Sequence, residues 1–163
     1  MIRNRISCNK DDLTALNERY SWIPNSDTIR PTQEDLHNKL FLIEEVNKSW
    51  LSIKDYIECQ FFKKPCIEKN GIKFNKDKEN IDEWIFDSSK FRYNLIPDSN
   101  HYVLWNTKYT FDKDFDDAII NKQIETFLQT KLNHNNFDFA WYKNPKPSIP
   151  EYFHVQVFWI IFL

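Results

Sequence analysis

The sequence predicts an α+β domain in which helices pack on an antiparallel sheet. Helical periodicity dominates the first part of the chain, whereas β-branched and aromatic residues bounded by turn residues become frequent after Pro97. Hydrophobic residues make up 41% of the 163 residues and aromatic residues 17%, which is enough for a substantial core. This length suits one domain. We divide it into a variable N-terminal segment at 1–30, a helical pair at 31–62 that extends the domain, and a sheet core at 91–163.

Two helices are predicted in the helical pair. The first begins at Thr32, because Pro31 precedes it and Thr32 with Asp35 resembles a capping box. The second begins after Ser52, whose side chain can cap it, and ends before Pro65. The residues that mark the apolar face of the first helix are Leu36, Leu40, Ile43 and Asn47, with Leu42 and Val46 beside them.

A short hairpin is predicted in the segment 63–80, which is rich in Lys and Asn. Asn70 and Gly71 form a strong turn dipeptide. Acidic residues are interleaved with the lysines, so we interpret the lysines as a solvated face rather than a binding patch. Gly71 is the single glycine of the chain, which excludes a glycine-rich phosphate loop. A phosphate would have to be held by side chains, helix N-termini or non-glycine turns.

The sheet is predicted from three segments rich in β-branched and aromatic residues, at 101–107, 137–142 and 152–162. Apolar residues at helical spacing predict a helix at 116–132, between the first two. Prolines make 144–150 a loop. The order of strand, helix, strand, loop and strand favours an antiparallel sheet with helices packed on it.

Charge and hydropathy argue against two classes of binding partner. The net charge is −2, with 22 basic and 24 acidic residues, which argues against a general nucleic-acid binder. The N-terminus lacks the apolar run of a signal peptide. The apolar run at 155–163 is too short for a bilayer, which needs about 20 residues. We therefore expect neither a nucleic-acid nor a membrane partner.

The three cysteines, Cys8, Cys59 and Cys66, form no disulfide framework, because their number is odd and no CxxC motif occurs. They are interpreted as reduced thiols in a cytosol-like compartment, so a cytoplasmic protein is expected. Cysteines and histidines do not show the spacing of zinc ligands, so neither a metal nor a cofactor is expected.

The last predicted strand carries the candidate site. Strand side chains alternate between faces, which predicts one apolar face directed at the core and a second face that is polar in its first half and apolar in its second. A polar cluster that leads into an apolar floor is typical of one wall of a ligand pocket. The core face carries Phe153, Val155, Val157, Trp159 and Ile161 after Glu151, and the second face carries Tyr152, His154, Gln156, Phe158 and Ile160.

His154 and Gln156 are therefore neighbours on one face. A neutral imidazole can attack phosphorus or an activated carbonyl, and an amide can hold the oxygens of the attacked group. The alternative is a half-buried pair that hydrogen-bonds its neighbours, since single histidines on strands are common.

Further candidates lie near this strand. His101 opens an earlier strand, and Asn144 and Ser148 belong to the loop before the last strand. Lys143 and Lys146 can attract an anion there, or they are simply solvated.

Several motifs, taken in order, resemble a known family. They are Pro31 to Ile57, Phe91 to Leu95, His101 to Trp105, Trp141 to Asn144, Ser148-Ile149 and Phe153 to Val155. The chain is similar to the domain-of-unknown-function family typified by N-acetylglucosamine-induced protein 1, across roughly residues 30 to 158. It departs from the family at Tyr152, where relatives have histidine, and at Arg92 and Asn94, where they have proline and glycine.

The last strand also resembles the signature of the histidine-triad superfamily, and specifically the His-x-Gln pattern of its nucleotidyl-transferase branch. This resemblance implies a histidine-triad-like fold in which His154 is the nucleophile and Gln156 contacts phosphate. It further implies that Ser148 is a phosphate-loop hydroxyl, with His101 and Asn144 as supporting groups.

Two functions follow as expectations. The first is a histidine-triad-like domain that binds a phosphorylated small ligand, a nucleotide or sugar nucleotide, or else a protein partner. Tyr152 in place of the first histidine favours this function. Its binding residues would be Gln156, Tyr152, Ser148, His101, Asn144 and Lys143. The alternative is a nucleotide phosphohydrolase or nucleotidyl transferase that uses His154 as its catalytic nucleophile.

Overall fold

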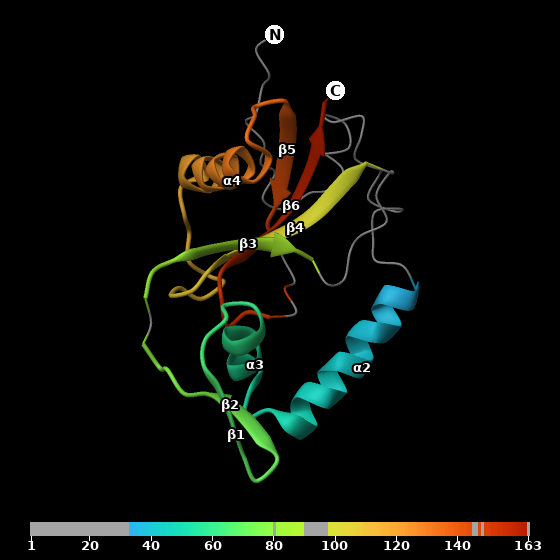
Figure 1. Cartoon of the computed structure of the whole chain (residues 1–163), viewed down its shortest axis with the longest axis vertical. Coiled ribbons are helices and arrows are strands. Elements are labelled where there is room, and N and C mark those ends of the chain that lie inside the picture. The colour runs from blue at the N-terminus through green and yellow to red at the C-terminus, as the bar shows by residue number, and fades with distance from the viewer. Residues whose placement is uncertain (1–32, 80, 90–97, 145–146, 148, 163) are drawn as a thin grey trace.

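The computed structural model describes residues 33–79, 81–89, 98–144, 147 and 149–162 (Figure 1). The expected variable segment at 1–30 lies outside these residues. Within them, helices pack on an antiparallel sheet, so the predicted α+β class is confirmed. None of the helices in these ranges combines the length and the apolar character needed to cross a membrane.

The main sheet has four antiparallel strands in the order β3-β4-β6-β5. Three of them were predicted, but the edge strand β3 was not, and it extends the sheet to residues before the expected boundary at residue 91. In the central pair, Val103 lies opposite Gln156 and Trp105 lies opposite His154. The strands are β3 (Trp84–Ser88), β4 (Ser99–Asn106), β5 (Phe137–Tyr142) and β6 (His154–Ile161).

Helix α4 (Asp117–Leu132) covers one face of this sheet. The side chain of Asp116 caps its start by accepting a hydrogen bond from the Ala118 N–H, and Asn133 ends it in the left-handed conformation, with φ of 59°. Ile120, Ile124 and Leu128 are fully buried, and each such side chain contributes about 1.5–3 kcal/mol through burial.

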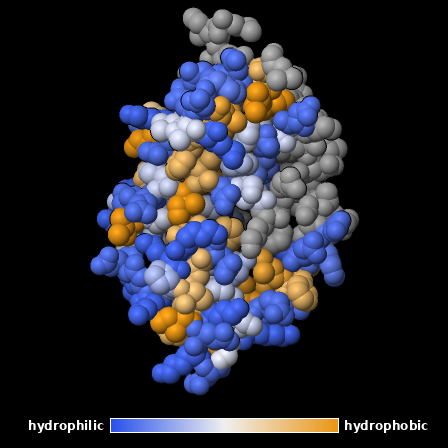
Figure 2. Space-filling view, viewed as in Figure 1, coloured by the Kyte–Doolittle hydropathy of each residue, from blue (hydrophilic) through white to orange (hydrophobic). Residues whose placement is uncertain are grey.

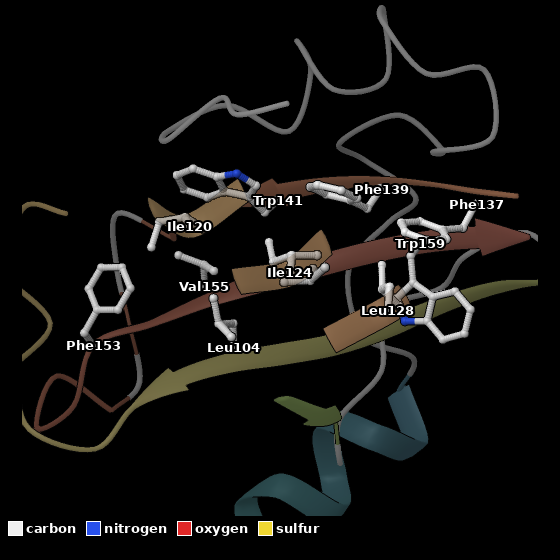
Figure 3. Packing of buried hydrophobic residues seen from close by; sticks show 11 residues of the cluster. Leu104, Ile120, Ile124, Leu128, Phe137, Phe139, Trp141, Phe153, Val155 and Trp159 are labelled. Atoms are coloured by element: carbon white, nitrogen blue, oxygen red, sulfur yellow. The ribbon is translucent and has the colours of Figure 1, made fainter. Parts of the chain in front are cut away.

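The core under α4 contains alternate residues from Phe153 to Trp159, as the alternation predicted (Figure 3). Ile161, which was also expected on the core face, is exposed at the end of β6. Period-two alternation places all of them on one face once the strand forms. From this segment the core takes Phe153, Val155, Val157 and Trp159, which pack with Leu104, Phe137, Phe139 and Trp141.

A helical module covers part of the opposite face. It consists of α2 (Gln33–Ser49), α3 (Ile53–Gln60) and a hairpin of β1 (Cys66–Lys69) and β2 (Ile72–Asn75). Figure 1 shows α3 and the hairpin together at one end of the molecule. Their apolar side chains form a second core with the sheet, made of Val46, Trp50, Tyr56, Ile57, Cys59 and Phe62 with Val103, Trp105 and Tyr152.

Two local predictions in this module are confirmed. Ser52 caps α3, because its hydroxyl oxygen accepts a hydrogen bond from the Asp55 N–H at 3.1 Å. Asn70 and Gly71 form the hairpin turn, with φ of 55° and 80°. Positive φ at both central residues is the requirement of a type I′ turn, which explains the Asn-Gly pair.

The predicted apolar face of α2 is wrong. Val46 is buried and Leu42 is partly buried against the second core, whereas Leu40 and Ile43 are 58% and 42% exposed. Apolar residues cover more of the helix than the domain can bury, so periodicity alone did not select the packed side. Figure 2 shows apolar side chains on the surface over α2.

Candidate functional site

His101 and Gln156 lie together on adjacent strands. They are diagonal neighbours on β4 and β6, and the His101 Nε2 donates to the Gln156 Oε1 at 2.5 Å. The His101 ring is buried and lies 5.1 Å from the Phe158 ring. The Gln156 amide oxygen is thus already engaged inside the protein.

His154 is enclosed by aromatic side chains. Its ring centroid lies 4.6 Å from that of Trp105 and 5.2 Å from that of Phe111, and only 7% of the residue is exposed. The Nδ1 lies 3.0 Å from the Tyr152 carbonyl oxygen. A carbonyl can only accept, so Nδ1 carries the proton and Nε2 keeps the lone pair.

Burial lowers the pKa of His154 to about 4. The Tyr152 carbonyl acts in the opposite direction by stabilising the protonated ring, whereas the positive charges of Lys143 and Lys39 lower the pKa further. The imidazole is therefore neutral at pH 7.

Lys143 and Asn144, two further predicted residues, have hydrogen-bond partners within the protein. The Lys143 ammonium donates to the Lys113 carbonyl oxygen at 3.2 Å and lies over the Phe111 ring at 4.7 Å from its centroid. The Asn144 Oδ1 accepts a hydrogen bond from the Tyr142 hydroxyl at 3.5 Å. Ser148 lies outside the described residues.

A polar cavity of about 280 Å³ lies where α3 and β2 meet the sheet. Tyr152 lines it, but His154, Gln156, His101, Asn144 and Lys143 do not. The cavity residues come from α3, the segment after it, β2 and the segments flanking β4 and β6. They include Ser52, Asp55, Glu58, Lys64, Asn75 and Thr107.

Tyr152 forms one wall of this cavity. The Phe62 ring packs edge-on against it with centroids 4.9 Å apart, and the Lys54 ammonium lies 5.3 Å from its centroid. Burial, the negative charge of Glu58 and a hydrogen bond to Glu58 raise the pKa of Tyr152 well above its ordinary value. The phenol therefore stays protonated and donates to the Glu58 carboxylate.

Asp55, one of three acidic groups in the cavity, is held by internal hydrogen bonds. It accepts from the Asn75 N–H at 2.8 Å, from the Lys78 ammonium at 2.7 Å and from the Ser52 hydroxyl at 2.5 Å. Burial alone would raise the pKa of Asp55, but the bonds from Lys78, Ser52 and Asn75 outweigh it and lower the pKa. Asp55 is thus a structural anion that holds α3 against β2.

Glu58 and the lysines have different roles, and Glu79 is the third acidic residue of the lining. Glu58 accepts from the Asn75 Nδ2 at 3.1 Å as well as from Tyr152. By contrast, within the described part of the chain the ammonium groups of Lys54 and Lys64 take part in no hydrogen bond or ion pair. These two cations remain free to meet a ligand.

Sequence reasoning missed most of this cavity. Lys64, Asn75 and Lys78 fall in the segment 63–80, whose lysines were interpreted as a solvated face. The one signal available was the Ser52-x-x-Asp55 pattern, which predicts a helix cap but not a cavity. The described residues contain no group of three or more His, Cys, Asp or Glu side chains arranged to hold a metal ion.

Comparison with known proteins adds one structural likeness. No protein-family model matches the chain, and no curated protein matches it. The chain is similar to the crystal structure of HTC1, with a TM-score of 0.47 and 15% sequence identity, over 83% of this chain and 77% of that one. What the site can do therefore follows from its own geometry.

Proposed function

We propose that this domain binds a small phosphorylated molecule, a nucleotide or sugar nucleotide, in the cavity beside Tyr152. The observation that carries the proposal is the pair of uncommitted lysine ammonium groups, Lys54 and Lys64, at a cavity where the carboxylates of Asp55 and Glu58 are already hydrogen-bonded. The volume of about 280 Å³ is close to the lower end of typical ligand pockets, which suits a small ligand.

The charges of the cavity leave two cations that an anion can meet. Lys78 is paired with Asp55, so these two charges offset each other. Glu58 is turned to Asn75 and Tyr152, and Glu79 is exposed to solvent. Lys54 and Lys64 are then the groups able to donate to phosphate oxygens. Because the chain has a single glycine, side chains rather than a glycine-rich loop would hold the phosphate.

Two aromatic side chains of the lining suit an uncharged ring. Phe62 and Tyr152 present aromatic surface, and the buried Thr107 lies beside them in the cavity lining. A nucleobase or sugar ring can pack against such a surface while its phosphate reaches the lysines. The lining thus offers both cations and aromatic surface, which suits a molecule with one anionic and one ring-shaped part.

We expect Lys64→Gln to weaken binding of such a ligand about tenfold or more, because a charge-assisted hydrogen bond contributes roughly 1.5–3 kcal/mol. Ligands are first selected from a nucleotide and sugar-nucleotide panel by thermal shift, and affinities are then measured by isothermal titration at low salt. Lys69→Gln is the matched control, since Lys69 is exposed on β1 and does not line the cavity. The absence of any stabilising ligand, or equal loss of affinity in both variants, would contradict the proposal.

A second candidate function is phosphoryl or nucleotidyl transfer through His154. The observation that favours it is the proton on Nδ1, which leaves the Nε2 lone pair able to attack phosphorus while the leaving group departs with the bonding electrons. The aromatic rings of Trp105 and Phe111 oppose it, because a substrate would have to displace them to reach the imidazole.

If this second function holds, a nucleotide labelled in its transferred phosphorus should leave an acid-labile covalent label on the wild-type chain. The label should disappear in His154→Ala and persist in His134→Ala, because His134 is exposed and lies near the C-terminal end of β6, whereas His154 begins this strand. A wild-type chain that stays unlabelled, or a label that survives in His154→Ala, would contradict transfer through His154.

A further inference from the structure

Two cysteines lie in contact beside the cavity. Cys59 is in the last turn of α3, and Cys66 is the first residue of β1. Their thiols are hydrogen-bonded to each other, although six residues separate them in the chain. Cys59 is buried, with 8% of its surface exposed, whereas Cys66 is exposed to solvent.

Backbone hydrogen bonds fix the chain segments that carry the two cysteines. The chain reverses after α3, where the Lys64 N–H donates to the Glu58 carbonyl at 2.9 Å and Lys63 adopts a φ of 57°. The start of β1 is held separately, because the Lys76 N–H donates to the Pro65 carbonyl at 2.9 Å and Cys66 pairs with Asn75. The two thiols therefore meet because α3 and the hairpin are each fixed.

We propose that Cys66 is an oxidation site and that Cys59 resolves it, so that a peroxide converts the pair into a Cys59–Cys66 disulfide. In the first step the Cys66 sulfur attacks a peroxide oxygen, the O–O bond breaks, and a sulfenic acid and water form. In the second step the Cys59 sulfur attacks the Cys66 sulfur, the S–O bond breaks, and the thiol proton of Cys59 leaves with the hydroxyl group as a second water.

The two cysteines differ in solvent exposure, which gives each a different role in the oxidation. Burial, and then the hydrogen bond with Cys66, raise the pKa of Cys59 to about 12, so this thiol keeps its proton until it attacks. Solvent exposure makes Cys66 the sulfur that a dissolved peroxide meets first. Because the two thiols are hydrogen-bonded to each other, the sulfur of Cys59 is within reach of Cys66 once Cys66 is oxidised.

The disulfide would also act on the cavity. The segment that it closes contains Phe62 and Lys64, both of which line the cavity. Linking its ends would move that wall and change ligand affinity. This consequence alone rests on the proposed function, and the oxidation itself is tested without a ligand.

The test uses the full chain carrying Cys8→Ser, which removes the third cysteine. The chain is treated with hydrogen peroxide, alkylated, and digested with trypsin, which separates the two cysteines by cleaving after Lys63. We expect a linked peptide pair whose mass is lower by two hydrogen atoms than the sum of the two thiol peptides, and which dithiothreitol separates. Circular dichroism checks that each variant is folded.

Two single variants in the same background separate the roles. With Cys59→Ala, Cys66 should stop at the sulfenic acid and react with dimedone. With Cys66→Ala, Cys59 should resist the peroxide and remain a thiol. The proposal is overturned if peroxide gives no linked pair in the folded chain, or if Cys59 is oxidised equally well without Cys66. Neither result bears on ligand binding by the reduced protein.

Discussion

We expect Trp105→Ala to lower the free energy of unfolding by about 3–5 kcal/mol, the range for removing a buried large aromatic side chain. Trp105 is buried on the central strand β4, and its ring lies 5.5 Å from that of Phe61 and 6.0 Å from that of Phe62. It also covers one side of His154. It thus joins the helical module to the sheet, and its removal would leave a void in the second core.

Urea unfolding followed by circular dichroism measures this effect, and Trp105→Phe is the matched control. Phenylalanine keeps an aromatic ring at the junction, so its cost should be clearly smaller than that of alanine. A loss below about 1 kcal/mol in Trp105→Ala, the size of an ordinary substitution, would show that the helical module does not depend on this contact.

We further expect the domain to lose about 3 kcal/mol of stability as the pH falls from 6.5 to about 4, because the pKa of His154 is lowered from 6.5 to about 4 by burial. In this interval the unfolded chain binds a proton at His154 that the folded chain does not. The contribution is fully present above pH 6.5, and it is lost as the pH falls toward the folded-state pKa.

His154→Phe is the control, since it removes the titrating group and should flatten the stability profile in this interval. Asp55 does not interfere, because its pKa is lowered from 3.8 and its own contribution is lost only at more acidic pH. Urea unfolding at a series of pH values supplies the profile. An equally steep profile in His154→Phe would show that His154 is not the group responsible.

The alternation of β6 could be interpreted correctly because it needs no knowledge of distant segments. Once the strand forms, Phe153, Val155 and Val157 must share a face, and an apolar face in water requires a cover. The helix that covers it was also visible, since Ile120 and Ile124 recur at helical spacing. The same local logic predicted the Asn70-Gly71 turn.

On the opposite face of β6, the contacts of the side chains could not be predicted in this way. Alternation places His154 and Gln156 side by side, but it does not say what lies over them. In the structure, the rings of Trp105 and Phe111 pack against His154. The Gln156 oxygen accepts a hydrogen bond from His101. These contacts depend on strand pairing and on a loop, both of which are non-local.

The cavity could not be predicted from the sequence for the same reason. Asp55, Asn75 and Tyr152 come from three distant segments, and only the docking of α3 and the hairpin on the sheet brings them together. Strand β3 was missing from the predicted sheet for a different reason. Its start, Trp84 to Phe86, is aromatic and β-branched, so a strand was predictable there, although its partner β4 was not.

The most direct test of the central claim is an amide chemical-shift titration of the full chain with the tightest ligand from the nucleotide and sugar-nucleotide panel. Binding in the cavity predicts saturable shifts at Lys64, Asn75, Thr107 and Tyr152, with much smaller changes at Phe158 on the far part of β6. Shifts centred on Phe158 and its neighbours, or no saturable shifts at all, would contradict it.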